Sequence, residues 1–222
     1  MRVLMAVLLL SAGALAKSED RELPQFNAVH VSSGMHATIA IGPKKPVHLE
    51  ADAETLARIE TAVEDGELSV RFKTGAAHDE SEVSIAIQTP ELRAVGASGG
   101  SVVKAEMTRA DRSELHASGG SEIHARGVDA GKLELHGSGG AVLTVAGKAD
   151  SLELRLSGGS RLHGRDLAVK DLEVQGSGGS QADLRASGKI RGGLSGGSQL
   201  HASGGGQAKV STSGGSEVDV EN

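Results

Sequence analysis

Apolar residues stand at every second position in short runs along most of this chain. Ile123-His124-Ala125 and Leu133-Glu134-Leu135 are two such runs, and the second recurs as Leu152-Glu153-Leu154 and Leu172-Glu173-Val174. Because successive side chains of a strand point to opposite faces, a period of two predicts strands with one face turned inward. The pattern therefore predicts an all-β chain with aliphatic inner faces.

The tripeptide Ser-Gly-Gly separates these runs, and seven copies at near-constant intervals begin 20, 20, 19, 20, 18 and 18 residues apart. Such a period is typical of stacked units that cover one another's apolar faces. Glycine suits a corner that needs positive φ or a close approach to the next rung. We expect the serines to stack in a column beside these corners. The predicted corners are Ser98-Gly99-Gly100, Ser118-Gly119-Gly120, Ser138-Gly139-Gly140, Ser157-Gly158-Gly159, Ser177-Gly178-Gly179, Ser195-Gly196-Gly197 and Ser213-Gly214-Gly215.

A coil of about 20 residues has a perimeter of roughly 65 Å, enough for three short strands around a narrow core. This geometry predicts a parallel β-helix-like solenoid. Leucine-rich repeats have a similar period but need an asparagine ladder, and no asparagine lies between Asn27 and Asn222. A flexible Gly/Ser linker is disfavoured by the strict aliphatic alternation between the glycines.

A distinct stretch precedes the repeats. Its strand-like runs cover residues 28–31, 37–41, 46–49, 68–72 and 83–87. We expect one short helix between the third and fourth runs, from an N-cap at Asp52 to a stop at Gly66, with an apolar face formed by Leu56, Ile59 and Val63. The predicted organisation is a signal peptide (1–16), a short N-terminal segment (17–25), N-terminal coils and cap (26–97) and the repeat solenoid (98–222).

The first sixteen residues have the features of an export signal. Arg2 precedes the apolar run from Val3 to Leu10, and Ala14-Leu15-Ala16 forms an A-x-A cleavage site. We expect cleavage between Ala16 and Lys17. The apolar run is shorter than the roughly 20 residues that span a bilayer, so we expect no integral membrane segment in the mature chain.

Composition narrows the function classes. The chain has no cysteine for a disulfide or a lipid anchor, and its two aromatic residues, Phe26 and Phe72, precede the repeats. The repeats therefore lack the aromatic surface on which sugar rings usually stack. Removing Arg2 with the signal leaves 23 − 1 = 22 basic and 29 acidic groups, a net charge of 22 − 29 = −7. Without a basic cluster, we expect no nucleic-acid partner.

One motif suggests a catalytic serine. Gly96-Ala97-Ser98-Gly99-Gly100 matches the G-x-S-x-G elbow of hydrolases. That elbow needs a strand-to-helix turn, followed in the chain by an acidic residue and a histidine. Because Ser98 begins a series of equivalent corners and no helical pattern follows it, we interpret it as a corner residue and predict no catalytic residues.

The histidines recur in register. His116 and His136 lie two residues before a triplet, and we expect them to approach each other on adjacent rungs because rungs are roughly 4.8 Å apart. A second column contains His124, Thr144, His163 and His201, each six residues after the serine or equivalent position of a triplet. Arg155 interrupts the first column and Thr144 the second. Since a structural metal site needs roughly four converging ligands, we predict no metal and no cofactor.

The acidic residues give no clear catalytic pattern. Asp129, Asp150, Asp166 and Asp183 lie at different offsets from the preceding triplets, 11, 12, 9 and 6 residues. We therefore expect no acidic ladder, which argues against a calcium-binding β-roll and weakens a polysaccharide lyase or hydrolase. At the end of the chain, Glu217, Asp219 and Glu221 alternate with valines, and such charges discourage uncontrolled strand addition. Homo-oligomers remain open, because flat β-helix faces suit assembly.

The N-terminal stretch resembles a known family. The similar segments are Phe26-Asn27-Ala28-Val29-His30-Val31-Ser32-Ser33-Gly34, Thr38-Ile39-Ala40-Ile41-Gly42 and Val47-His48-Leu49-Glu50-Ala51-Asp52, with Ile59, Val63, Asp65-Gly66 and Leu68. They resemble the bacterial domain of unknown function 2807, a "putative autotransporter adhesin, head GIN domain". The resemblance runs from about Phe26 to the end of the chain. It implies a right-handed, single-stranded β-helix-like fold on exported Gram-negative proteins.

Two functions follow as expectations. The first is an exported, non-catalytic module, adhesin-like or structural, that binds a protein or glycan of the envelope or surface. The alternative is an envelope enzyme acting on a polysaccharide. An autotransporter carries a membrane-embedded barrel of tilted strands, and we expect none in these residues. The periplasm is therefore the simpler expected destination, with the cell surface or secretion as the alternative.

Overall fold

The computed structural model describes residues 17–75 and 82–221. The predicted export signal, including Ala16, and residues 76–81, between the predicted strand runs 68–72 and 83–87, lie outside these residues, and Lys17 is the first residue of β1. The elements are β1 (Lys17–Arg21), β2 (Ala28–Val31), β3 (His36–Ile41), β4 (Val47–Ala51), α1 (Ala53–Arg58), β5 (Ile59–Glu64), β6 (Glu67–Phe72), β7 (Ser84–Thr89), β8 (Ala94–Ala97), β9 (Val102–Glu106), β10 (Ala110–Ala117), β11 (Glu122–Gly137), β12 (Val142–Leu156), β13 (Arg161–Gly176), β14 (Gln181–Ala186), β15 (Lys189–Leu194), β16 (Gln199–Ser203), β17 (Gln207–Thr212) and β18 (Glu217–Glu221).

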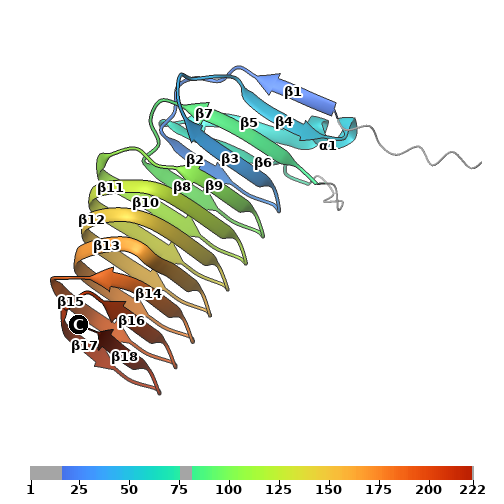
Figure 1. Ribbon diagram of the computed structural model, residues 1–222. Coiled ribbons are helices and arrows are strands. Elements are labelled where there is room, and N and C mark those ends of the chain that lie inside the picture. Colours follow the sequence, from blue (N-terminus) through green and yellow to red (C-terminus); the bar gives the residue numbers. More distant parts are fainter. Residues whose placement is uncertain (1–16, 76–81, 222) are drawn as a thin grey trace, which may run out of the picture.

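The strands wind into a β-solenoid of about six turns with coils of about 20 residues, as the sequence predicts (Figure 1). Equivalent residues of neighbouring rungs pair in parallel, so that Leu115 lies beside Leu135 and Leu135 beside Leu154. The prediction of three short strands per coil is wrong for the middle coils. β11, β12 and β13 are continuous strands of 15 or 16 residues, because irregularities such as the one between Ala125 and Val128 bend the strand without ending it.

Each corner is a tight turn built on the two glycines. In the seven predicted corner triplets, the first glycine has φ between 61° and 68° and the second has φ between 76° and 85°. The Ser121 amide donates to the Ser118 carbonyl at 3.3 Å, closing the turn. Two consecutive positive φ values at the centre of a turn match type I′, a geometry that glycine adopts without a steric penalty.

The first rungs are not visited in chain order. β2 and β3 pair in parallel with β6 and β7 on one side and with β8 and β9 on the other. The chain thus forms an inner rung, continues outward through residues 47–89, and then returns to the opposite side. Ser33 and Gly34, with φ of 68° and 76°, form the corner of this inner rung. The described solenoid therefore begins well before the first Ser-Gly-Gly triplet.

A small cap of antiparallel strands and one helix covers the outermost N-terminal rung (Figure 1). β1 pairs with β4, β4 with β7, and β5 with β6. The side chain of Asp52 accepts hydrogen bonds from the amides of Glu54 and Thr55, so the predicted N-cap is confirmed. The predicted extent of the helix is wrong, because α1 ends at Arg58, and Ile59 and Val63 belong to β5.

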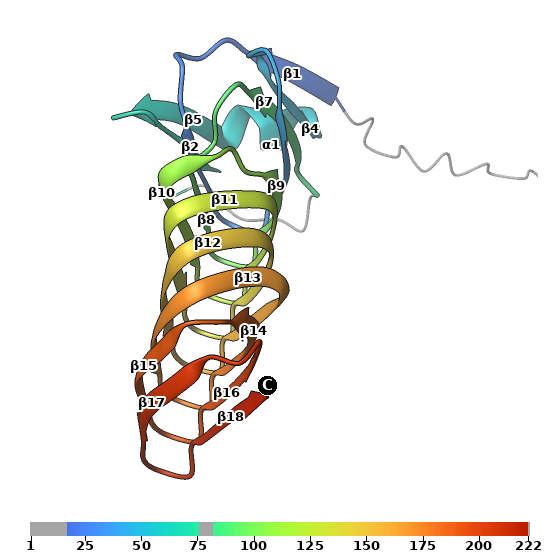
Figure 2. The same cartoon turned by 60° about the vertical axis from the view of Figure 1, so that its left-hand side comes forward.

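The core is a stack of aliphatic side chains running the length of the solenoid. Leu115, Leu135 and Leu154 are fully buried on successive rungs. Towards the C-terminus the coils divide into two shorter strands each, β14 with β15 and β16 with β17 (Figure 2). The last apolar residues, Val218 and Val220, are only partly buried. The C-terminal rung is therefore less well packed than the middle rungs.

Candidate ligand-binding face

The strand segments that precede the corners carry three columns of polar side chains on their outer side. We call this surface the ladder face. Registers of β10, β11, β12, β13 and β15 align the first column across four rungs and the other two across five. The first column contains Arg112, Lys132, Ser151 and Asp171; the second contains Glu114, Glu134, Glu153, Glu173 and Arg191; the third contains His116, His136, Arg155, Gln175 and Gly193.

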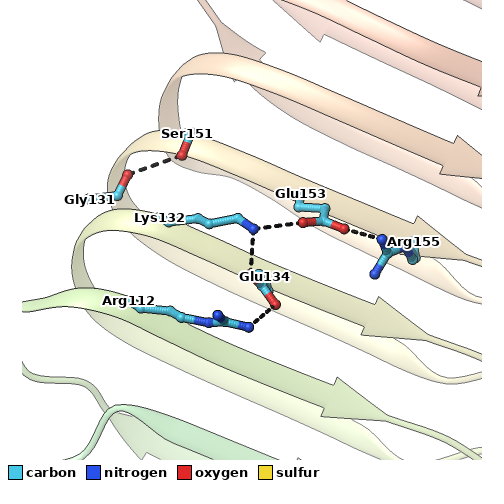
Figure 3. Close-up of polar contacts among 7 residues, drawn as sticks. All are labelled: Arg112, Gly131, Lys132, Glu134, Ser151, Glu153 and Arg155. Carbon is cyan, nitrogen blue, oxygen red and sulfur yellow. Dashed lines mark hydrogen bonds and ion pairs between the residues drawn. The ribbon is translucent and has the colours of Figure 1, made fainter.

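The four glutamates of the second column form an acidic ladder, so the expectation that none exists is wrong. The aspartate offsets do not reveal this ladder, because its acidic residues are glutamates at the centre of strand runs such as Leu133-Glu134-Leu135 and Leu172-Glu173-Val174. The ladder is interleaved with cations (Figure 3). The Nζ atom of Lys132 lies 2.6 Å from Oε1 of Glu134 and 2.8 Å from Oε2 of Glu153. Arg112 contacts Glu134 at 2.7 Å, and Arg155 pairs with Glu153.

These contacts shift the proton affinities of the network. The hydrogen bond from Lys132 is the main cause that lowers the pKa of Glu134 and of Glu153. The same bonds, to Glu134 first and Glu153 second, raise the pKa of Lys132. The Glu134 side chain is only 8% exposed. Burial of a carboxyl group opposes ionisation, but the two cations outweigh it, and the network is held in its charged form at neutral pH.

The third column begins with a stacked pair of imidazoles. The ring centroids of His116 and His136 lie 6.1 Å apart, with their planes inclined by 24°. The prediction that these two residues approach each other is confirmed. Arg155 follows them in register, as predicted. In the second predicted column, Thr144 lies between His124 and His163, and this column runs on the opposite side of the corner.

A groove of about 480 Å³ runs along the third column. It is lined by His116, His136, Arg155, Gln175 and the corner serines Ser138, Ser157, Ser177 and Ser195, with adjoining backbone. A second hollow of about 640 Å³ lies between the first two columns towards β15, beside Lys132, Glu153 and Lys189. The residues that line each hollow come from successive rungs. An elongated ligand with hydrogen-bonding groups or anionic groups fits this shape and chemistry.

The triplet serines border this groove, and the structure adds a second serine column that sequence reasoning missed. The residue after each glycine pair points inward, and Ser101, Ser121, Ser160, Ser180 and Ser198 are buried. The Ser121 hydroxyl group donates to the Ala97 carbonyl at 2.8 Å and accepts a hydrogen bond from the Ser118 amide at 3.0 Å. The recurrence of S-G-G-S was the available signal. These hydroxyl groups hold the corners rather than a ligand.

Ser98 has a histidine partner that its motif did not reveal. Nε2 of His30 lies 3.1 Å from Oγ of Ser98, and burial lowers the pKa of His30. The His30 ring occupies space left by Gly96, where a Cβ atom would lie 2.3 Å from Nδ1. Among the described residues no carboxylate hydrogen-bonds to this ring, and Ser98 lies in a strand-to-strand corner. The contact therefore ties the inner rung to the first triplet.

Comparisons with known proteins agree with this architecture. Residues 25–206 match the model of a family described as "Putative auto-transporter adhesin, head GIN domain". A search of curated proteins found no match. In residues 17–75 and 82–221, no helix combines the length and apolar character needed to cross a bilayer.

Solved structures share the fold at low sequence identity. A "putative adhesin" from Bacteroides fragilis is 16% identical, with a TM-score of 0.79 over 95% of this chain and 98% of that chain. A "putative lipid binding protein" from Parabacteroides distasonis is 15% identical, with a TM-score of 0.71 over 92% and 96%. A "putative adhesin" from the same species is 18% identical, with a TM-score of 0.66 over 93% and 97%.

Proposed function

Because the chain belongs to the family of auto-transporter adhesin-like head GIN domains, we propose that it is an exported, non-catalytic module that binds an envelope or surface ligand through its ladder face. The observation that carries the proposal is the groove of about 480 Å³, which presents imidazole, guanidinium, amide and hydroxyl groups at rung spacing. Regularly spaced polar groups suit a repeating ligand, such as a glycan, or an extended protein segment.

The acidic ladder is the feature that best suits the alternative, a polysaccharide-acting enzyme. Glycoside hydrolysis needs one carboxyl group with a raised pKa as the acid and a second carboxylate as base or nucleophile. In the ladder, Glu134 and Glu153 both have lowered pKa values and are engaged by Lys132. Their arrangement favours a charged, structural surface, and the proposal is therefore a binding role without catalysis.

Location forms part of the proposal. The predicted signal peptide would direct the chain across the inner membrane, and cleavage between Ala16 and Lys17 would release the mature protein. We propose the periplasm as its compartment, with the cell surface or secretion as the alternative. The ligand would be an envelope or surface protein or glycan. Homo-oligomers would leave the groove free if they form through other faces.

The binding role can be tested with purified envelope glycans and envelope protein fractions. We expect saturable binding of one fraction to the wild-type chain. His116→Ala combined with His136→Ala and Arg155→Ala should weaken this binding at least about tenfold, equivalent to ~1.4 kcal/mol. The matched control is His124→Ala with His163→Ala on the opposite side of the corner, and it should bind normally. Equal binding by both variants would contradict the assignment of the ladder face.

A further inference from the structure

The column that contains His124, Thr144 and His163 lies on the side of the corner opposite the ladder face. In the last coils this column gains carboxylates. Strand registers place His163, Asp183, His201 and Asp219 on four successive rungs. Imidazoles and carboxylates thus alternate at adjacent-rung spacing. The sequence carries this signal, since all four residues lie six positions after a triplet serine. A hollow of about 350 Å³ follows these residues.

Three donor groups converge at the C-terminal end of this column. Nδ1 of His201 lies 3.1 Å from Oδ2 of Asp219, and Nε2 of His201 lies 3.9 Å from Oε2 of Glu221. One donor atom from each residue falls within 4.8 Å of the other two. Asp183, the next carboxylate in the column, pairs with Arg165 at 2.5 Å. The available set is therefore one imidazole and two carboxylates.

We propose that His201, Asp219 and Glu221 bind a divalent transition-metal ion such as Zn²⁺. Zinc accepts histidine nitrogen and carboxylate oxygen at about 2.0–2.2 Å, and sites with three protein ligands complete the tetrahedron with water. Donors at such bond lengths lie about 3.3–3.6 Å apart in a tetrahedron. Because the three donor atoms lie within 4.8 Å of one another, they reach this spacing by closing at most about 1.5 Å. The exposed fractions of 35%, 60% and 63% leave the three side chains room for the adjustment.

The chemistry favours zinc over calcium or magnesium. Imidazole nitrogen suits zinc, copper and nickel, whereas calcium and magnesium prefer six or more oxygen ligands. The carboxylates of Asp219 and Glu221 would balance the charge of a divalent ion. The sequence predicted no metal because Arg155 and Thr144 interrupt the two histidine columns and a structural site needs roughly four converging ligands. Glu221 lies outside the column of His201 and Asp219, two residues further along β18.

The ion would tie the last rung to the one before it. His201 belongs to β16, and Asp219 and Glu221 belong to β18. Val218 and Val220, which hold β18 to the core, are only partly buried. A ligand that binds only the folded form stabilises it in proportion to the logarithm of ligand concentration over Kd. The metal would therefore stabilise the least packed end of the described solenoid.

The first test is titration of the untagged, chelator-treated chain with Zn²⁺ by calorimetry. We expect one site per chain, and a loss of affinity of at least about tenfold in His201→Ala and in Asp219→Asn combined with Glu221→Gln. His124→Ala is the matched control, because His124 lies in the same column between Lys104 and Thr144. Absence of saturable Zn²⁺ binding, or unchanged binding by His201→Ala, would overturn the site.

The second test addresses the tie between strands. Zn²⁺ should slow digestion of the C-terminal strand by a carboxypeptidase that is not itself affected by added zinc, and His201→Ala should abolish that protection. Saturable binding without protection of β18 would overturn the proposed bridging. Selective binding of Ca²⁺ in place of Zn²⁺ would overturn the role of the imidazole. Because these residues lie away from the ladder face, either result leaves the proposed ligand-binding function to its own test.

Discussion

At the scale of single residues, the two glycines of each corner have different roles. Both have positive φ, but only the first stacks closely on the rung before it. A Cβ atom on Gly158 would lie 3.0 Å from the Gly139 amide nitrogen, whereas a Cβ atom on Gly159 would meet nothing within 4 Å. The first glycine thus serves both conformation and rung spacing, and the second serves conformation alone.

We predict that Gly158→Ala destabilises the chain more than Gly159→Ala. Each substitution incurs the left-handed backbone penalty of ~1–2 kcal/mol for a residue with a Cβ atom. Gly158→Ala adds contact with the neighbouring backbone, and such overpacking typically costs a further ~1–3 kcal/mol. Denaturant unfolding of both variants measures the difference. An equal decrease in the free energy of unfolding of the two variants would show that the contact between rungs contributes nothing to stability.

Ser113 is a second residue whose role the structure defines. It occupies the inward position that Leu133 and Leu152 occupy on the next two rungs, and its buried side-chain oxygen has no hydrogen-bond partner among the residues that the structure describes. An unsatisfied buried polar group costs ~1–3 kcal/mol. We predict that Ser113→Ala raises the free energy of unfolding by about 1 kcal/mol. The comparison is Ser121→Ala, which removes a hydroxyl group with two partners and should lower it.

The role of a single residue could be predicted from the sequence where it depends on the local backbone alone. Glycine pairs and the Asp52 cap could be assigned because their backbone demands are local. The Ser98–His30 contact could not, since the two residues are 68 positions apart and pair only because the rungs are visited out of order. Lys132, Glu134 and Glu153 could be aligned by offset, but their burial and pairing depend on side-chain packing across rungs.

At the scale of elements, the cap shows how a short pattern can be misinterpreted. Leu56, Ile59 and Val63 fit one helical face, yet the helix ends at Arg58. Asp65 and Gly66, with φ of 50° and 80°, form a tight hairpin between β5 and β6. Asp-Gly is a strong signal for such a hairpin, and Ile59, Thr61 and Val63 are β-branched residues that favour strands. The turn dipeptide outweighed the helical spacing.

The outermost strand, β1, depends in part on a titratable contact. Nδ1 of His48 on β4 lies 2.6 Å from Oδ1 of Asp20 on β1, and Nε2 lies 3.2 Å from Glu50. The bond to Asp20 is the main cause that raises the pKa of His48. A group with a raised folded-state pKa contributes stability that is complete below its unfolded pKa of about 6.5 and is lost as the pH rises through the folded value.

We therefore predict that attachment of β1 weakens as the pH rises above about 6.5. An NMR titration of the His48 ring should give a pKa above that of an exposed histidine, and Asp20→Asn should lower it. Glu22→Gln, which removes an exposed acidic group adjacent to β1, is the matched control and should have little effect. An unchanged His48 pKa in Asp20→Asn would contradict the role of this pair.

At the scale of the whole molecule, periodicity made the architecture predictable and left the function open. Register follows directly from the triplet intervals, which is why the His116–His136 stack could be anticipated. The out-of-order rungs at the N-terminus break the period, and no local pattern encodes them. The ladder face presents similar polar side chains on successive rungs and has no single cluster of reactive groups. Its ligand therefore depends on three-dimensional geometry, which the alternation of apolar and polar residues does not specify.

Export is the central requirement of the proposed function, because a ligand-binding envelope module must leave the cytoplasm. The measurement is protease accessibility and N-terminal mass analysis of the protein in Gram-negative cells that produce it, before and after permeabilisation of the outer membrane, with purified protein as the control for intrinsic resistance. We predict a mature chain that begins at Lys17, protected in intact cells and digested after permeabilisation. An unprocessed chain that remains protected until the inner membrane is broken would contradict the account.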